Sequence, residues 1–183
     1  MEQSIIVASF GGQGVQMLGK LLSYTACEET DKFVTYFASY SMQMRGGTSD
    51  CYVAVSDKKV GAPKFKKADY LLIFSPAALA QHKANLKPGG TMIINTGSIH
   101  EDVEVPEGCK LVKVDVVAGA NEAGSLKAQN LVMLGAFIGC TDIFEADSVQ
   151  KTIDNQLGKK KPEMLPINRK AFEIGLAVGR AAK

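Results

Sequence analysis

Three glycines within four positions, at 11, 12 and 14, separate a short apolar run from a helical pattern near the start of the chain. Residues 5–8 are apolar without helical spacing, as expected for a strand buried on both faces. Apolar residues then recur at helical spacing between Val15 and Leu22. The glycines permit positive φ angles, and the helix start gathers unpaired N–H groups at the positive end of the helix dipole. The chain therefore begins with a strand–turn–helix unit whose turn can receive a phosphate or another anion.

Two familiar nucleotide-binding patterns do not fit this turn. The dinucleotide fingerprint needs a third glycine where the chain has Met17, and an acidic residue at the end of the second strand. The predicted second strand, residues 33–38, runs into Ser39 instead. A Walker A loop is also absent, because no Gly-Lys-Ser/Thr follows the glycines. Two interpretations remain: a turn that only permits tight strand-to-helix packing, or one that also contacts a ligand or a partner chain.

Length and composition predict a single domain over residues 1–183, because the chain is long enough for one sizeable core and too short for two ordinary domains. No apolar run is long enough to span a bilayer, and the first ten residues lack the pattern of a signal peptide. A cytoplasmic protein without a membrane or nucleic-acid partner is therefore expected. Five lysines within residues 58–67 either steer an anionic partner or form a solvated loop.

Catalytic side chains are hard to find in this sequence. His82 is predicted on the surface of a helix that begins after Ser75, and His100 in a polar loop. We expect neither histidine to bind a metal or to act as an acid or base. A Gly-x-Ser-x-Gly nucleophile elbow is missing. The cysteines include no Cys-x-x-Cys pair, so no zinc or iron–sulfur site is encoded locally and free thiols are expected (Cys27, Cys51, Cys109 and Cys140).

A lone arginine in a glycine-rich segment is the second candidate site. Residues 39–50 are mostly polar, and Arg45 stands directly before Gly46 and Gly47. Arginine presents a planar fork that suits a carboxylate or a phosphate, and the glycines let an extended group approach closely. The alternative interpretation is an arginine that only ties this loop to a nearby carboxylate.

The order of predicted elements favours a single-domain α/β fold with a Rossmann-like open sheet, mixed or mainly parallel, and helices on both faces. In such sheets ligands bind beyond the carboxyl ends of the strands. The glycine turn and the segment 39–50 both follow strands at that edge. Strands are predicted at 5–8, 33–38, 51–55, 70–74, 91–95 and 110–115; helices are predicted from 15, over 76–86 with a stop at 87–90, and within 117–141, 142–158 and 167–183.

The helical region 117–141 carries two further expectations. Leu126, Leu131, Leu134 and Phe137 occupy its apolar positions, and small residues permit close approach of another helix (Ala128, Gly135 and Gly139). We therefore expect this region to pack tightly against the rest of the fold.

Short motifs that together identify a known family are distributed over nearly the whole chain. They are Gly11-Gly12-Gln13-Gly14-Val15-Gln16, Leu18-Gly19-Lys20, Ser39-Tyr40, Met44-Arg45-Gly46-Gly47-Thr48 before Cys51, then Lys127, Asn130, Leu134-Gly135, Asn168, Ala171-Phe172 and Gly175. In this combination the chain resembles the gamma subunit of 2-oxoacid:ferredoxin oxidoreductases. The sequence around Arg45 is most similar to subunits that serve 2-oxoglutarate or branched-chain oxoacids. One departure is Ser41-Met42-Gln43, where a Gly-Pro-Glu-like segment is expected.

The resemblance implies a complex that cleaves 2-oxoacids oxidatively with thiamine diphosphate, magnesium, coenzyme A and iron–sulfur clusters, and passes electrons to ferredoxin. This chain lacks the Gly-Asp-Gly…Asn signature of a thiamine diphosphate site and a cluster-binding set of cysteines. It is therefore expected to be non-catalytic and to bind none of these cofactors alone. The implied partners are thiamine diphosphate-binding alpha and beta subunits and a ferredoxin-like delta subunit; in isolation the chain could form a homodimer.

The resemblance also implies a contact surface toward coenzyme A or a partner chain, formed by Gly11, Gly12, Gln13, Gly14, Tyr40, Arg45, Gly46 and Gly47. Two other functions stay open at this point. The glycine turn alone also fits a stand-alone Rossmann-type enzyme acting on a nucleotide. A regulatory or scaffold module with an empty turn fits equally well.

Overall fold

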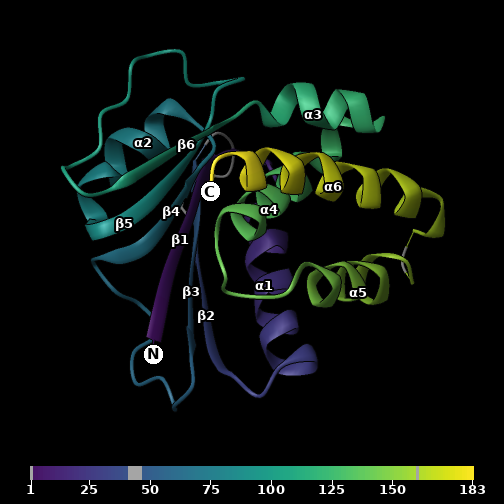
Figure 1. Ribbon diagram of the computed structural model, residues 1–183, viewed down its shortest axis with the longest axis horizontal. Coiled ribbons are helices and arrows are strands. Elements are labelled where there is room, and N and C mark those ends of the chain that lie inside the picture. The colour runs from purple at the N-terminus through teal and green to yellow at the C-terminus, as the bar shows by residue number, and fades with distance from the viewer. Residues whose placement is uncertain (1, 41–46, 160) are drawn as a thin grey trace.

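A six-stranded sheet in the order β2-β3-β1-β4-β5-β6 organises the computed structural model, which describes residues 2–40, 47–159 and 161–183 (Figure 1). β1 pairs in parallel with β4, and the parallel pairing continues through β5 to β6. β3 is antiparallel to both of its neighbours, β1 and β2. The predicted open sheet of mixed type is confirmed. The strands are β1 (Glu2–Phe10), β2 (Phe33–Tyr40), β3 (Thr48–Ser56), β4 (Ala68–Ile73), β5 (Leu86–Asn95) and β6 (Lys110–Val114).

Helices cover both faces of the sheet, as predicted, but unequally. Figure 1 shows α1, α4, α5 and α6 on one side of the sheet and α2 on the other. Alternate residues of β1 follow this division: Ile5 and Val7 belong to the larger core, and Ile6 and Ala8 to the smaller. The helices are α1 (Val15–Glu29), α2 (Pro76–His82), α3 (Val116–Ala123), α4 (Gln129–Cys140), α5 (Ala146–Leu157) and α6 (Leu165–Ala181), with 3-10 turns η1 (Lys83–Asn85), η2 (Leu126–Ala128) and η3 (Pro162–Met164).

The start of α2 is formed as the sequence predicts, but its end is not. The Ser75 hydroxyl accepts a hydrogen bond from the Ala78 N–H at 3.3 Å, which caps the helix. The predicted stop at 87–90 is wrong, because these residues lie inside β5. Pairing between β4 and β5 is irregular there, and Gly89 has a φ of +75°. An irregular strand tolerates proline and glycine as well as a helix end does.

The region 117–141 is helical, as predicted, but it is divided into α3, η2 and α4. Gly124 has a φ of +111° and ends α3, and the Ser125 hydroxyl accepts a hydrogen bond from the Lys127 N–H to start the next turn. This break shifts the helical phase. Leu126 is consequently 52% exposed rather than buried, and its predicted apolar position is wrong.

α4 is almost entirely buried and lies against α6 through glycines of both helices. A Cβ atom on Gly135 would overlap the Phe172 carbonyl oxygen, and one on Gly175 would overlap the Val132 carbonyl oxygen. The predicted close approach at Gly135 and Gly139 is confirmed. Within the described residues, no helix is both long and apolar enough to cross a membrane.

Candidate functional site

The glycine turn lies where β1 and β2 end and β3 begins, at one edge of the sheet. β1 and β2 both run antiparallel to β3, so their carboxyl ends meet at this edge. Phe10 is opposite Thr48, and the Gly11 N–H donates to the Gly47 carbonyl oxygen at 3.2 Å. Both β1 and β2 therefore end at one edge, as predicted, and the described end of the second candidate segment lies beside the glycine turn. We call this region, residues 9–16 with 47–49, the ligand edge.

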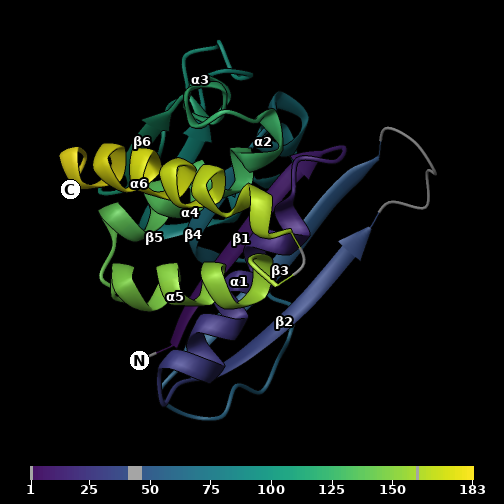
Figure 2. The same cartoon turned by 90° about the vertical axis from the view of Figure 1, so that its right-hand side faces the viewer.

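The predicted contact residues are placed unevenly by the structure. Gly11 to Gly14 form the turn between β1 and α1, and Gly47 lies directly before β3. Tyr40 is the last residue of β2, the outermost strand on one side of the sheet (Figure 2). Arg45 and Gly46 lie outside the described residues, so their predicted roles remain predictions.

The three positions of the turn differ in whether they require glycine. Gly11 has a φ of +88° and Gly14 a φ of +78°, which favour glycine. A Cβ atom on Gly14 would also lie 2.8 Å from Asn130 Cγ. Gly12 has no positive φ, and a Cβ atom there would meet nothing within 4 Å among the described residues. The expected conformational need for glycine is thus confirmed at two positions and wrong for Gly12.

Polar groups of the turn are incompletely satisfied within the described part of the chain. The Gln13 N–H donates to the Gly11 carbonyl oxygen at 3.1 Å, but the Gln13 Oε1 atom is buried without a hydrogen-bond partner. α1 begins at Val15 with no side-chain cap and no acidic residue in its first turn. The turn therefore has a buried acceptor and helix N–H groups without side-chain partners in the described part of the chain.

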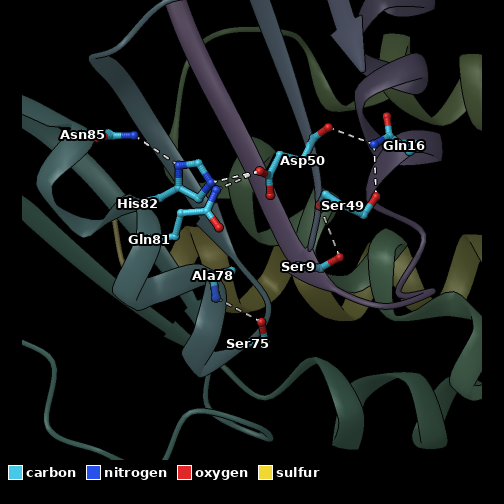
Figure 3. Close-up of polar contacts among 9 residues, drawn as sticks. All are labelled: Ser9, Gln16, Ser49, Asp50, Ser75, Ala78, Gln81, His82 and Asn85. Atoms are coloured by element: carbon cyan, nitrogen blue, oxygen red, sulfur yellow. Dashed lines mark hydrogen bonds and ion pairs between the residues drawn. The ribbon is translucent and has the colours of Figure 1, made fainter. Parts of the chain in front are cut away.

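Gln16 ties the helix that follows the turn to the neighbouring strands. Its Nε2 donates to Ser49 Oγ at 3.1 Å and to the Asp50 carbonyl oxygen at 2.9 Å (Figure 3). Its Oε1 accepts from the Tyr36 hydroxyl at 2.6 Å. Sequence reasoning places Gln16 in a motif but assigns it no role. The amide fixes the turn against the start of β3.

His82 is buried, so its predicted surface position is wrong. Its ring is 2% exposed, and Nε2 lies 3.2 Å from the Oδ2 atom of Asp50, which is itself 4% exposed. A usable signal is present in the sequence: Ala78, Leu79 and His82 recur at helical spacing and therefore share one helix face. Sequence reasoning misses Asp50 because its partner is 32 positions away.

The cysteine nearest to the ligand edge is not equipped to react. Burial, with a smaller contribution from the Asp50 carboxylate, raises the pKa of the Cys51 thiol to about 12. The thiolate is the reactive form of cysteine, and at this pKa it is scarce at neutral pH. Among the described residues, no three His, Cys, Asp or Glu side chains are grouped as a metal site requires.

Comparisons with known proteins place this chain among subunits of oxoacid oxidoreductases. The family model described as pyruvate ferredoxin/flavodoxin oxidoreductase matches residues 4–178. The 2-oxoglutarate synthase subunit KorC of Methanocaldococcus jannaschii is 30% identical over 181 residues, which cover 98% of this chain and 95% of that protein. The ketoisovalerate oxidoreductase subunit VorA of Methanothermobacter marburgensis is 30% identical over 95% of this chain, but only 36% of that protein is covered.

Solved structures show the same likeness. A 2-oxoglutarate:ferredoxin oxidoreductase from Magnetococcus marinus, with 2-oxoglutarate, coenzyme A and succinyl-CoA bound, matches all of this chain with a TM-score of 0.89 and 27% identity. The keto/oxoacid ferredoxin oxidoreductase gamma subunit from Geobacter sulfurreducens matches 98% of this chain and 99% of its own, with a TM-score of 0.84 and 25% identity. This chain spans about a third of the VorA protein and of the Magnetococcus marinus chain, at 36% and 32% of their lengths.

Proposed function

The chain belongs to the pyruvate ferredoxin/flavodoxin oxidoreductase family, and from this premise we propose that it is the gamma subunit of a multi-subunit 2-oxoacid:ferredoxin oxidoreductase. Such a complex decarboxylates a 2-oxoacid oxidatively, forms the acyl-CoA and passes the electrons to ferredoxin. The likeness to subunits named for 2-oxoglutarate and for ketoisovalerate supports a 2-oxoacid as substrate. 2-Oxoglutarate is the substrate that we propose to test first.

Within this complex we propose that the ligand edge contacts coenzyme A. The observation that carries this proposal is Gly12, an exposed position that requires glycine neither for its φ nor, among the residues that the structure describes, for lack of space. A glycine at such a position lets another molecule approach the backbone closely. The uncapped start of α1 suits the phosphate groups of coenzyme A, and the unpartnered Gln13 Oε1 can accept a hydrogen bond from the ligand. The Magnetococcus marinus relative was solved with coenzyme A bound.

The redox chemistry is proposed to take place on partner subunits. Thiamine diphosphate with magnesium would be held by alpha and beta subunits, and iron–sulfur clusters by partners that include a ferredoxin-like delta subunit. The sequence of this chain supports this division, because it has neither a thiamine diphosphate signature nor a cluster-binding set of cysteines. We propose that the complex works in the cytoplasm and that this chain contributes no catalytic residue to it.

Co-purification from the native cell tests the assembly. We expect a tagged form of the chain to bring down a thiamine diphosphate-binding partner and ferredoxin-dependent 2-oxoacid oxidation. Isolation as a lone monomer or homodimer, without such a partner, would contradict the proposal. Saturable binding of NAD, NADP or FAD to the isolated chain would instead favour a stand-alone nucleotide enzyme.

Replacement of Gly12 tests the coenzyme A contact within the assembled complex. Gly12→Val adds a side chain where the chain itself has open space, so folding should be unaffected and the KM for coenzyme A should rise. Gly61→Val is the matched control, since Gly61 lies in an exposed loop and a Cβ atom added to it would also meet nothing within 4 Å. An unchanged KM for coenzyme A in Gly12→Val, with the complex intact, would show that coenzyme A does not contact the ligand edge at Gly12.

A further inference from the structure

A carboxylate and an imidazole are buried together on the α2 side of the sheet, directly behind the ligand edge. Asp50 is the third residue of β3 and is 4% exposed; His82 is the last residue of α2 and is 2% exposed. His82 Nε2 lies 3.2 Å from Asp50 Oδ2, and Gln81 Nε2 donates to the same oxygen at 3.3 Å (Figure 3). The side chain of Asp50 thus contacts α2 through two consecutive residues.

The other side of the ring faces Asn85. Asn85 Nδ2 lies 3.1 Å from His82 Nδ1, so the imidazole is held between this amide and the Asp50 carboxylate. His82 Nε2 has no regular hydrogen-bond partner within the described residues, so its 3.2 Å approach to Asp50 Oδ2 is a close polar contact.

Packing alone does not account for this pair. The Asp50 Oδ1 atom is buried and has no hydrogen-bond partner in the described part of the chain. A buried carboxylate with so few donors costs stability, and apolar residues of similar volume are often as stable or more stable at such positions. The arrangement is therefore better explained by what the pair holds in place than by what it adds to stability.

The backbone around Asp50 shows what is held. On the α1 side of the sheet, Gln16 Nε2 donates to the Asp50 carbonyl oxygen at 2.9 Å. On the α2 side, His82 and Gln81 contact the Asp50 carboxylate (Figure 3). Side chains from both sides of the sheet therefore contact β3 at the same residue, Asp50. Gly47, three positions earlier, accepts the hydrogen bond from the Gly11 N–H that joins β3 to the glycine turn.

We propose that the Asp50–His82 pair positions the ligand edge: it fixes the start of β3 so that the Gly47 carbonyl oxygen and the glycine turn keep their alignment for binding. Asp50 and His82 act through the backbone and do not touch the ligand. The proposal rests on the proposed function for its readout in coenzyme A binding. Its structural content, the alignment of Gly47 with Gly11, is independent of which ligand binds.

His82→Leu in the assembled complex tests the proposal. The substitution keeps the buried volume but removes the group that faces the carboxylate. We expect the KM for coenzyme A to rise about 2- to 30-fold, the range of effects that residues without ligand contact exert on binding, while kcat at saturating coenzyme A changes less than about twofold. His82→Gln places an amide on the same face and should restore part of the KM. Asp50→Asn combined with His82→Leu should raise the KM by less than the product of the two single effects, because both changes break one contact.

Thr152→Val is the control for a general loss of stability. It removes a buried hydrogen bond of 3.1 Å between Thr25 on α1 and Thr152 on α5, away from the ligand edge. Its melting temperature should fall while the KM for coenzyme A stays at the wild-type value. A His82→Leu variant that loses stability yet keeps its KM, as this control does, would overturn the positioning role.

Hydrogen exchange at the Gly11 amide tests the positioning role of Asp50 and His82 independently of the coenzyme A contact. His82→Leu should lose protection at the Gly11 amide, which donates to Gly47, whereas Thr152→Val should keep it. Faster exchange at Gly11, even if Gly12→Val leaves the KM unchanged, would support the positioning role and reject only coenzyme A as the ligand. Unchanged exchange at Gly11 in His82→Leu would overturn the inference whatever the ligand is.

Discussion

Glycines act differently in two regions of this molecule, the α4–α6 helix pair and the turn between β1 and α1. In the helix pair, a Cβ atom on Gly135 or Gly175 would overlap a backbone carbonyl oxygen of the other helix. In the turn, a Cβ atom on Gly11 or Gly12 would meet nothing within 4 Å in the described part of the chain. Gly11 is explained by its positive φ, but Gly12 is not. The glycines of the helix pair are thus required by the packing of the chain, whereas we propose that Gly12 serves the approach of a ligand.

The largest effect is expected in the helix pair. Gly175→Ala places a methyl group on the Val132 carbonyl oxygen, so a helix backbone must shift. We expect a loss of about 3 kcal/mol or more, at the upper end of the range for overpacked cores. For a domain of this size the melting temperature should fall by roughly 10 °C.

Thermal unfolding of the isolated chain measures this difference. Gly61→Ala serves as the control, because the exposed loop around Gly61 has room for a methyl group. A melting temperature of Gly175→Ala that matches the control would show that the helix pair adapts easily, and the contrast between the two regions would then disappear.

The next largest effect is expected from replacement of Arg45. This residue stands in the segment between Tyr40 and Gly47, and both of these flanking residues lie at the ligand edge. Arg45→Lys keeps the charge but loses the bidentate fork. Loss of a charge-assisted hydrogen bond costs roughly 1.5–3 kcal/mol, or about tenfold to a hundredfold in affinity. We therefore predict a KM for coenzyme A that is raised by this factor if the arginine binds a phosphate.

Subunit retention distinguishes the two roles open to this arginine. A raised KM with an intact complex indicates a phosphate contact, whereas dissociation of the subunit at unchanged KM indicates an ion pair with a partner subunit. If Arg45→Ala leaves the KM, the turnover and the subunit content within about twofold of wild type, the arginine only tethers its loop.

A comparison of Gly14 with Gly12 sharpens the contrast inside the turn. Gly14→Ala must keep a φ of +78° and displace the Asn130 side chain, so we expect a loss of about 1–3 kcal/mol. Gly12→Ala meets neither obstacle and should stay within about 0.5 kcal/mol of wild type. Urea unfolding of the isolated chain measures both. Equal losses in the two variants would show that Gly12 also serves the fold.

The strand–turn–helix unit could be predicted because its signals are contiguous. Apolar runs, glycines and the helical spacing after Val15 all lie within a few residues, and the Ser75 cap is equally local. The element order also predicted that the glycine turn and the segment after β2 follow strands at one edge of the sheet, and β1 and β2 do end at the same edge. Local patterns therefore defined most of the fold.

The contacts behind the site could not be predicted in the same way. Asp50 and His82 meet because β3 and α2 pack on each other, and sequence spacing does not state how a helix is rotated against a sheet. A short helix gives so few turns that its histidine is easily assigned to solvent, although Ala78 and Leu79 indicate the buried face. The prediction for the segment 87–90 failed for a related reason, because proline and glycine suit a strand irregularity as well as a helix end.

The smallest effect on stability is expected from replacement of Asp69, at the opposite edge of the sheet. The hydrogen bonds of this carboxylate contrast with those of Asp50. Asp69 Oδ2 accepts hydrogen bonds from the Ser4 N–H at 2.8 Å, the Ser4 hydroxyl at 2.7 Å and Lys87 Nζ at 2.9 Å. Burial acts to raise the pKa of Asp69, but the hydrogen bonds from Ser4 and Lys87 outweigh it and hold the pKa below its ordinary 3.8. This carboxylate is well compensated, and the one behind the ligand edge is not.

The lowered pKa determines how the stability contributed by Asp69 depends on pH. A carboxyl group with a lower pKa in the folded state stabilises the protein above its unfolded pKa, and this contribution is lost as the pH falls through the folded pKa. Because the Asp69 side chain is 32% exposed, water screens the pair, and Asp69→Asn should cost less than about 1 kcal/mol at pH 7. Urea unfolding of wild type and variant should show this difference at pH 7 and a smaller one at pH 3. A difference that is the same at both pH values would mean that the lost hydrogen-bond geometry, and not the charge of Asp69, accounts for the effect.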